Sequence, residues 1–190
     1  MLLLVGLGNP GSNYTNTRHN IGFKIIDAIN SHFKLSKQKP KFKGLLTTGN
    51  IEEKKIYAIK PLTFMNNSGT AIKELIDYFK IDAKNVIVFH DDMDIDFGKV
   101  KAKFGGSSAG HNGIESIDKF IGKDYSRVRI GIGHPKQKKK VNNHVLEDFK
   151  EDEEEMIKEI TENIVKQIPT LIEKKIDLFS SKVNQNLNGI

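Results

Sequence analysis

The first eleven residues, MLLLVGLGNPG (1–11), join an apolar run to a glycine-rich turn. The run over 1–7 is typical of a buried strand, because it is too short for a membrane span and lacks the basic lead-in of a signal peptide. Gly6, Gly8 and Gly11 spell G-x-G-x-x-G, the fingerprint of dinucleotide-binding loops. The stretch therefore predicts a strand that leads to a ligand site, and it raises NAD as one candidate ligand.

The residues that follow argue against a dinucleotide. A dinucleotide loop opens a helix whose N–H groups meet the pyrophosphate, whereas SNYTNTR (12–18) is typical of a turn and helical spacing begins only at His19. Asp27 has about the spacing of a ribose-binding acid, but it falls inside that helix pattern. We therefore expect the glycines to bring the backbone close to another ligand at the carboxyl end of the strand.

Strand and helix patterns alternate along the rest of the chain. Strands are expected at 42–51, 55–61, 86–90, 99–104 and 127–132, and helices at 19–33, from near 68, at 112–121 and at 151–180. Pro169 is expected to kink or split the last helix. This order predicts an α/β fold: a single domain over 1–190, built as a three-layer α/β/α sandwich with a mixed sheet and a helical C-terminal segment at about 151–180.

Composition excludes several kinds of chemistry. The 190 residues include no cysteine, which removes disulfides, thiolate metal sites and a cysteine nucleophile. No G-x-S-x-G serine elbow occurs in the chain. If the protein cleaves a bond, the nucleophile that remains is water activated by a base or water bound to a metal.

Charge is distributed unevenly. Residues 97–140 hold 11 Lys and Arg against three acidic residues, whereas 147–162 hold nine acidic against two basic residues. A basic segment beside an acidic one fits a surface that faces a polyanion, although Lys-rich composition also serves simply to solvate a surface. The acidic run at the start of a helix suits the helix dipole.

Four stretches concentrate polar side chains where strands lead into helices. They are GNPGSNYTNTRHN (8–20), TFMNNSG (63–69), FHDDMD (89–94) and GGSSAGHNG (105–113). Their histidines, carboxylates and amides are the parts that base-assisted hydrolysis needs. A metal held by HDDMD with His19 or His111 is the alternative, but no familiar metal-ligand spacing supports it.

Taken together, these motifs resemble those of bacterial peptidyl-tRNA hydrolases. The resemblance rests on GLGNPGSNYTNTRHNIGF (6–23), KPLTFMNNSG (60–69), FHDDMDIDFGKVKAKFGGSSAGHNG (89–113) and RVRIGIGHP (127–135), in that order and spacing. It implies hydrolysis of the ester between a peptide and the 3′-terminal ribose of tRNA, which recycles tRNA released from stalled ribosomes. It also implies peptidyl-tRNA as the partner, no cofactor or metal, no membrane, a monomer and a cytoplasmic location.

The resemblance implies roles residue by residue. His19 is expected to be the base that activates water, and Asp91 the carboxylate that orients it. The expected substrate-holding amides are Asn9, Asn66 and Asn112, with Asn66 also close to the water and the ester carbonyl; the expected cleft residues are Tyr14, Phe64 and Met65. Lys103, Arg129 and Lys138 match positions near the acceptor stem and its 5′-phosphate, and His111 is expected to support Asn112.

Two questions stay open on the sequence. If 99–104 and 127–132 are neighbouring strands, Lys101, Lys103, Arg127 and Arg129 form a phosphate-binding stripe. A noncatalytic protein that binds the tRNA acceptor stem is the alternative function. The intact pair of His19 and Asp91 argues against it, because a binding protein does not need that pair.

Overall fold

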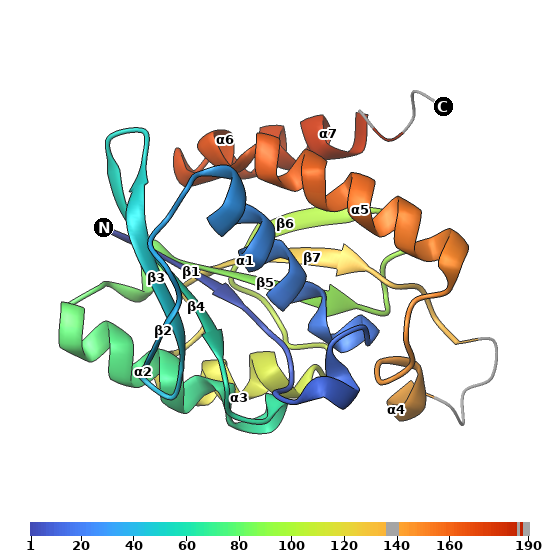
Figure 1. Cartoon of the computed structure of the whole chain (residues 1–190), viewed down its shortest axis with the longest axis horizontal. Helices are drawn as coiled ribbons and strands as arrows, with labels where there is room; N and C mark the ends of the chain where they lie inside the picture. The colour runs from blue at the N-terminus through green and yellow to red at the C-terminus, as the bar shows by residue number, and fades with distance from the viewer. Residues whose placement is uncertain (136–140, 186, 188–190) are drawn as a thin grey trace.

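The computed structural model describes residues 1–135, 141–185 and 187, and over them seven strands form one sheet in the order β2-β3-β4-β1-β5-β7-β6 (Figure 1). The strands are β1 (Leu2–Gly6), β2 (Lys39–Lys41), β3 (Gly44–Ile51), β4 (Lys54–Pro61), β5 (Val86–Asp92), β6 (Val100–Phe104) and β7 (Ser126–Gly131). The four central strands β4, β1, β5 and β7 are parallel, and the outer pairings are antiparallel. The mixed sheet predicted from the sequence is confirmed.

Helices cover both faces of this sheet. They are α1 (Ile21–His32), α2 (Ser68–Phe79), α3 (Asn112–Ile121), α4 (Val141–His144), α5 (Glu151–Lys166), α6 (Ile168–Ile172) and α7 (Ile176–Gln185), with 3-10 turns η1 (Ser12–Tyr14), η2 (Arg18–Asn20), η3 (Met65–Asn67) and η4 (Ala83–Asn85). Figure 1 shows α1 and α5 on one side of the sheet and α2 and α3 on the other. The three-layer sandwich is therefore confirmed. None of the described helices has both the length and the apolar character needed to cross a membrane.

Two separate cores explain why the first strand is apolar at every position. Leu2 and Leu4 of β1 pack with α1 and α5, whereas Leu3 and Val5 pack with α2 and α3. A strand in the middle of a parallel sheet is buried on both faces and reads as a continuous apolar run.

Gly6 and Gly8 of the opening stretch serve helix packing, which corrects the expectation that they bring the backbone close to a ligand. A Cβ at Gly6 would lie 2.2 Å from the carbonyl oxygen of Gly22, and one at Gly8 would lie 2.8 Å from the Phe23 ring. The absent side chains let α1 lie directly against the end of β1. Only Gly11 of the three has a positive φ, at 105°, where the chain turns into η1.

Two elements differ from the sequence prediction. The sequence pattern does not predict β2, because Lys39–Lys41 is a short polar edge strand whose central proline interrupts any strand pattern. The helix pattern of 151–180 is divided into α5, α6 and α7. Pro169 lies in the first turn of α6, where its missing N–H has no intrahelical partner to lose.

The last helix protects the β6 edge of the sheet. Asn184 accepts a hydrogen bond from the Val100 N–H at 3.0 Å and donates one to the Val100 carbonyl at 2.7 Å. Ser180 accepts another from the Ala102 N–H at 2.9 Å. These side chains replace a neighbouring strand, so α7 satisfies β6 groups that would otherwise recruit a second chain.

Candidate active site

The polar motifs meet at the carboxyl ends of β1 and β5. β4 and β5 lie on opposite sides of β1, so the order in which strands are added to the sheet reverses at β1. Open α/β sheets bind ligands at such a switch point. His19 follows β1 in η2, Asp91 is the next-to-last residue of β5, and His111 is the N-cap of α3. We call the cavity at this edge the catalytic hollow. It is lined by His19, Asp91, Asp92, Met93, Asp94, Ser108, Ala109, Gly110, His111, Asn112 and Val145.

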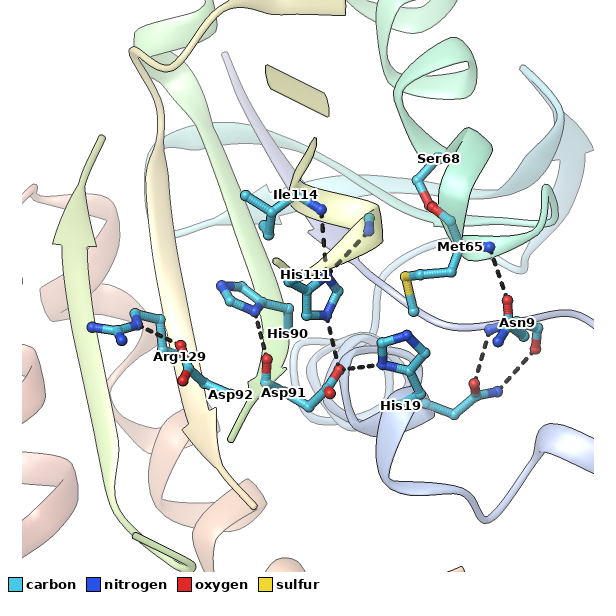
Figure 2. Close-up of polar contacts among 12 residues, drawn as sticks. Asn9, His19, Met65, Ser68, His90, Asp91, Asp92, His111, Ile114 and Arg129 are labelled. Atoms are coloured by element: carbon cyan, nitrogen blue, oxygen red, sulfur yellow. Dashed lines mark hydrogen bonds and ion pairs between the residues drawn. The ribbon is translucent and has the colours of Figure 1, made fainter. Parts of the chain in front are cut away.

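One oxygen of Asp91 contacts two imidazoles. Asp91 Oδ1 lies 2.8 Å from Nδ1 of His19 and 3.0 Å from Nε2 of His111 (Figure 2). The Asp91 side chain is 2% exposed. Nδ1 of His111 accepts from the N–H groups of Gly113 and Ile114 at the start of α3. Because that nitrogen is an acceptor, the proton of His111 sits on Nε2 and is donated to Asp91.

The same logic sets the tautomer of His19. An ionised carboxylate only accepts hydrogen bonds, so Nδ1 of His19 carries the proton and Nε2 carries the lone pair. Within the described residues no hydrogen bond engages Nε2 of His19, whose ring lines the catalytic hollow. A lone pair that no described residue occupies, on a histidine at a cavity wall, is what a general base requires.

Burial and partners shift the pKa values of this pair in opposite directions. Burial works to raise the pKa of the Asp91 carboxyl, but His19 and His111 outweigh it and hold that pKa well below its usual range. Burial lowers the pKa of His19, but the charge of Asp91 and the hydrogen bond to it leave that pKa above its ordinary value. Asp91 is therefore ionised at neutral pH and stabilises the protonated form of His19.

His90 belongs to the FHDDMD motif, but sequence reasoning gave it no role of its own in the site. Its Nδ1 donates to the backbone carbonyl of Asp91 at 2.7 Å, and its ring centroid lies 4.8 Å from that of His111. Burial, and then the electrostatic effect of His111, lower the pKa of His90 well below its ordinary value. A neutral His90 packs beside His111 without adding charge. The sequence did contain a clue to its position: neighbouring residues of a strand point to opposite faces, so His90 was expected on the sheet face opposite to Asp91.

His19, Asp91 and His111 bring three potential metal ligands within 4.8 Å of one another. Their hydrogen bonding does not suit a metal. Both nitrogens of His111 are already engaged, Nδ1 as an acceptor and Nε2 as a donor, so a metal on Nε2 would require an imidazolate. The site fits metal-free acid–base chemistry better than it fits a metal centre.

Asn9 stands beside this triad with its oxygen already used. Its Oδ1 accepts from the Met65 N–H at 2.8 Å, and its backbone is held by Asn20 through bonds of 2.8 and 2.9 Å (Figure 2). The bond from the Met65 N–H fixes the orientation of the Asn9 amide, so that its NH₂ group points away from that N–H and can donate to a substrate. A fixed donor of this kind suits a carbonyl oxygen or an oxyanion.

The remaining predicted residues divide into two groups. Asn112 is the first residue of α3 and lines the catalytic hollow. Met65 is buried against Asn9, as described above. Tyr14 in η1, the 59% exposed Phe64 and the exposed Asn66 in η3 are not among the described residues that line the hollow. The structure brings the first group close to the catalytic residues, and it does not put the second group in the wall of the hollow.

The expected basic stripe is partly wrong. β6 and β7 are neighbours, with Lys101 opposite Arg129 and Lys103 opposite Arg127. Arg129 is paired with Asp92 at 2.7 Å. Burial, together with the positive charges of Arg129 and Arg127, lowers the pKa of the half-buried Lys103. Lys138 lies outside the described residues.

Arg127 is the residue of the expected stripe that is not available to a phosphate. Its side chain is 1% exposed and donates to Asp118 at 2.7 Å and to the Ser107 carbonyl at 2.8 Å. Its guanidinium also lies 4.7 Å from the centre of the Tyr125 ring. The loop before α3 covers this arginine, so it holds a wall of the site and cannot meet a phosphate.

Comparisons with known proteins agree on one family. A family model described as peptidyl-tRNA hydrolase matches residues 3–189. A peptidyl-tRNA hydrolase of Pelagibacter ubique is 73% identical over 184 residues, covering 97% of this chain and 99% of the relative. One of Bartonella henselae is 46% identical over 189 residues, covering 100% and 98%. The crystal structure of the peptidyl-tRNA hydrolase from Acinetobacter baumannii is 34% identical with a TM-score of 0.90, covering 97% and 94%.

Proposed function

The chain belongs to the peptidyl-tRNA hydrolase family and hydrolyses peptidyl-tRNA, and from this premise we propose that His19 is its general base. One observation carries the proposal: the hydrogen bond of 2.8 Å between Nδ1 of His19 and the buried Asp91, which leaves Nε2 without a hydrogen-bond partner among the described residues, on a residue that lines the catalytic hollow. This is the arrangement of a base oriented by a carboxylate.

The proposed reaction is attack of water on the ester that joins the peptide to the 3′-terminal ribose. Nε2 of His19 takes a proton from water while the oxygen attacks the ester carbonyl. Asp91 stabilises the imidazolium that forms, because it faces the protonated Nδ1. The tetrahedral intermediate collapses, the ribose oxygen leaves, and the proton passes from His19 to that oxygen. The products are a free peptide carboxyl group and tRNA with a free hydroxyl.

We assign the developing oxyanion to amide donors. Asn9 supports this assignment best, because the bond from the Met65 N–H to its oxygen fixes which end of the amide carries the NH₂ donors. Asn66 and Asn112 are proposed to hold the substrate beside it, with Asn66 completing the catalytic set, and Tyr14, Phe64 and Met65 to border the peptide and the terminal nucleotide. Asn112 has the support of its place in the wall of the hollow.

Lys103 and Arg129 are proposed to contact the acceptor stem, with Lys138 as a further contact. Their support is the pairing of β6 with β7, which puts both side chains on one sheet face next to Asp92 of the hollow. Contacts of this kind are electrostatic, so binding should weaken steeply with added salt. We also propose that residues 1–190 act as one domain, as a monomer, in the cytoplasm.

The test is a turnover assay with a defined N-blocked aminoacyl-tRNA. His19→Ala should abolish peptide release while tRNA binding, measured separately, stays close to wild type. His32→Ala is the matched control, because His32 is an exposed histidine at the end of α1. Turnover by His19→Ala at the wild-type rate would exclude His19 as the base.

A further inference from the structure

Arg18, the residue before the proposed base, is a buried charge that takes no part in the chemistry described above. Its side chain is 3% exposed, and its Nη2 lies 2.6 Å from the Glu153 carboxylate on α5. Its Nη1 donates to the backbone carbonyls of Glu147, at 3.2 Å, and of Asp148. The guanidinium carbon also lies 5.2 Å from the centre of the Phe149 ring.

The segment that Arg18 grips, residues 145–149, runs beside the residues around His19, and we call it the strap. The Arg18 N–H donates to the Glu147 carbonyl at 3.0 Å, and the His19 N–H donates to the Val145 carbonyl at 2.8 Å. Thr17 and Asp148 form an antiparallel bridge one step further on. The backbone that carries His19 is therefore paired with the strap, and Val145 of the strap lines the catalytic hollow.

Arg18 pairs with one particular carboxylate of the acidic run on α5, that of Glu153. A buried guanidinium needs a counter-charge and hydrogen-bond acceptors, or its desolvation is not compensated. Glu153 provides the charge and also accepts from the Lys150 N–H at 2.8 Å, so its carboxylate is fixed at the first turn of α5. Glu154 beside it is half exposed, and among the described residues its carboxylate pairs with Lys24, at 3.9 Å. One carboxylate of the acidic run thus has a role that general solvation and the helix dipole do not explain.

We propose that Arg18 is a positioning residue for hydrolysis: held by Glu153 and the strap carbonyls, it fixes the backbone of His19 and so the direction of Nε2. The inference rests on His19 being the base. A local shift of about 1 Å at such a group is enough to slow catalysis by about 10²-fold. The ion pair between Arg18 and Glu153 joins residues 135 positions apart in the chain, and it connects the segment that carries the base to the start of α5.

Two substitutions test this ion pair without removing the base. Arg18→Lys keeps the charge but loses the planar fork that reaches the carboxylate and the carbonyls together. Glu153→Gln keeps an acceptor for Lys150 but loses the charge that faces Arg18. Glu154→Gln is the matched control, since it removes the same charge one residue away without touching Arg18 or the strap.

Three quantities should be measured with N-blocked aminoacyl-tRNA: kcat, KM and the acidic limb of the kcat–pH profile. For Arg18→Lys we expect kcat to fall by at least about tenfold, KM to stay within about threefold, and the limb to move to lower pH. The limb moves because a loosened His19 loses contact with Asp91, which holds its pKa up. The groups that face the His19 ring, Asp91 from β5 and His111 from α3, are unchanged. Glu153→Gln should give a smaller effect in the same direction, and Glu154→Gln none.

The pH limb separates positioning from simple loss of folded protein. Partial unfolding lowers the amplitude of the profile and leaves its midpoint in place, so an unmoved midpoint in folded Arg18→Lys and Glu153→Gln overturns the proposal. If Arg18→Lys does not fold, the midpoint of the acidic limb in Glu153→Gln decides whether the proposal stands. An inactive His19→Ala beside fully active Arg18 variants would refute the positioning role only, whereas an active His19→Ala would refute the base itself.

Discussion

Replacing Asp91 with asparagine tests the electrostatic core of the site. Both imidazoles contact the same atom, Oδ1, so the amide oxygen of the substituted side chain can occupy that place and keep both hydrogen bonds. Asp91→Asn therefore removes a negative charge while it preserves the geometry.

The expected loss follows from the distance between the charges. The imidazolium that forms on His19 has its Nδ1 2.8 Å from Asp91 Oδ1, which puts the two charge centres about 4 Å apart. At an effective dielectric constant of about 20, this pair is worth about 4 kcal/mol in the transition state. Since about 1.36 kcal/mol corresponds to a tenfold change, kcat should fall by about 10³-fold.

Single-turnover hydrolysis of N-blocked aminoacyl-tRNA measures this loss directly. Asp118→Asn is the matched control, because one oxygen of Asp118 also accepts two bonds, from Tyr125 and Arg127, away from the hollow. It should lower stability and leave kcat of the folded enzyme within a few-fold. If Asp91→Asn keeps kcat within about threefold of wild type while its tRNA binding is intact, the reasoning about the imidazolium is refuted.

Three further predictions follow from the same contacts. Because Asp91 leaves the pKa of His19 above its ordinary value, His19 is protonated and inactive at low pH; kcat should rise with pH through a midpoint above about 6.5, and a midpoint well below that value contradicts the pairing. Arg127→Met leaves the Asp118 carboxylate, 11% exposed, without its cation and should cost about 3–5 kcal/mol in urea denaturation; a loss under about 1 kcal/mol would show that the ion pair is not needed. EDTA should leave turnover unchanged, because both nitrogens of His111 are engaged; loss of turnover that a divalent ion restores would make the site a metal centre.

The sequence was sufficient for most of the fold and for the central pair of the site. Apolar runs and alternating apolar residues predicted β3 to β7, and helical spacing predicted α1, α2 and α3, because each pattern is a local response to burial on one face or two. The carboxyl ends of parallel strands lie at one sheet edge, which predicted that His19, Asp91 and His111 would lie near one another, and the family resemblance named His19 and Asp91 as the pair.

The contacts that hold this pair in place were decided by the tertiary structure. Arg127 and Arg129 share a strand face in the sequence pattern, yet the loop before α3 covers only Arg127 and turns it from a phosphate ligand into a buried support. The partner of His111 depends on the start of α3, whose N–H groups take Nδ1 and leave Nε2 for Asp91.

The sequence by itself determined most of the elements and the chemistry available at the end of β1, since both follow from residue types and short spacings. Only the tertiary structure decided which polar groups are buried and with whom. Gly6 faces α1 and not a ligand, and Arg18 finds Glu153 on a helix far along the chain. The partner of a buried side chain depends on which element packs over it. That element can lie far along the chain, so a local sequence pattern does not identify it.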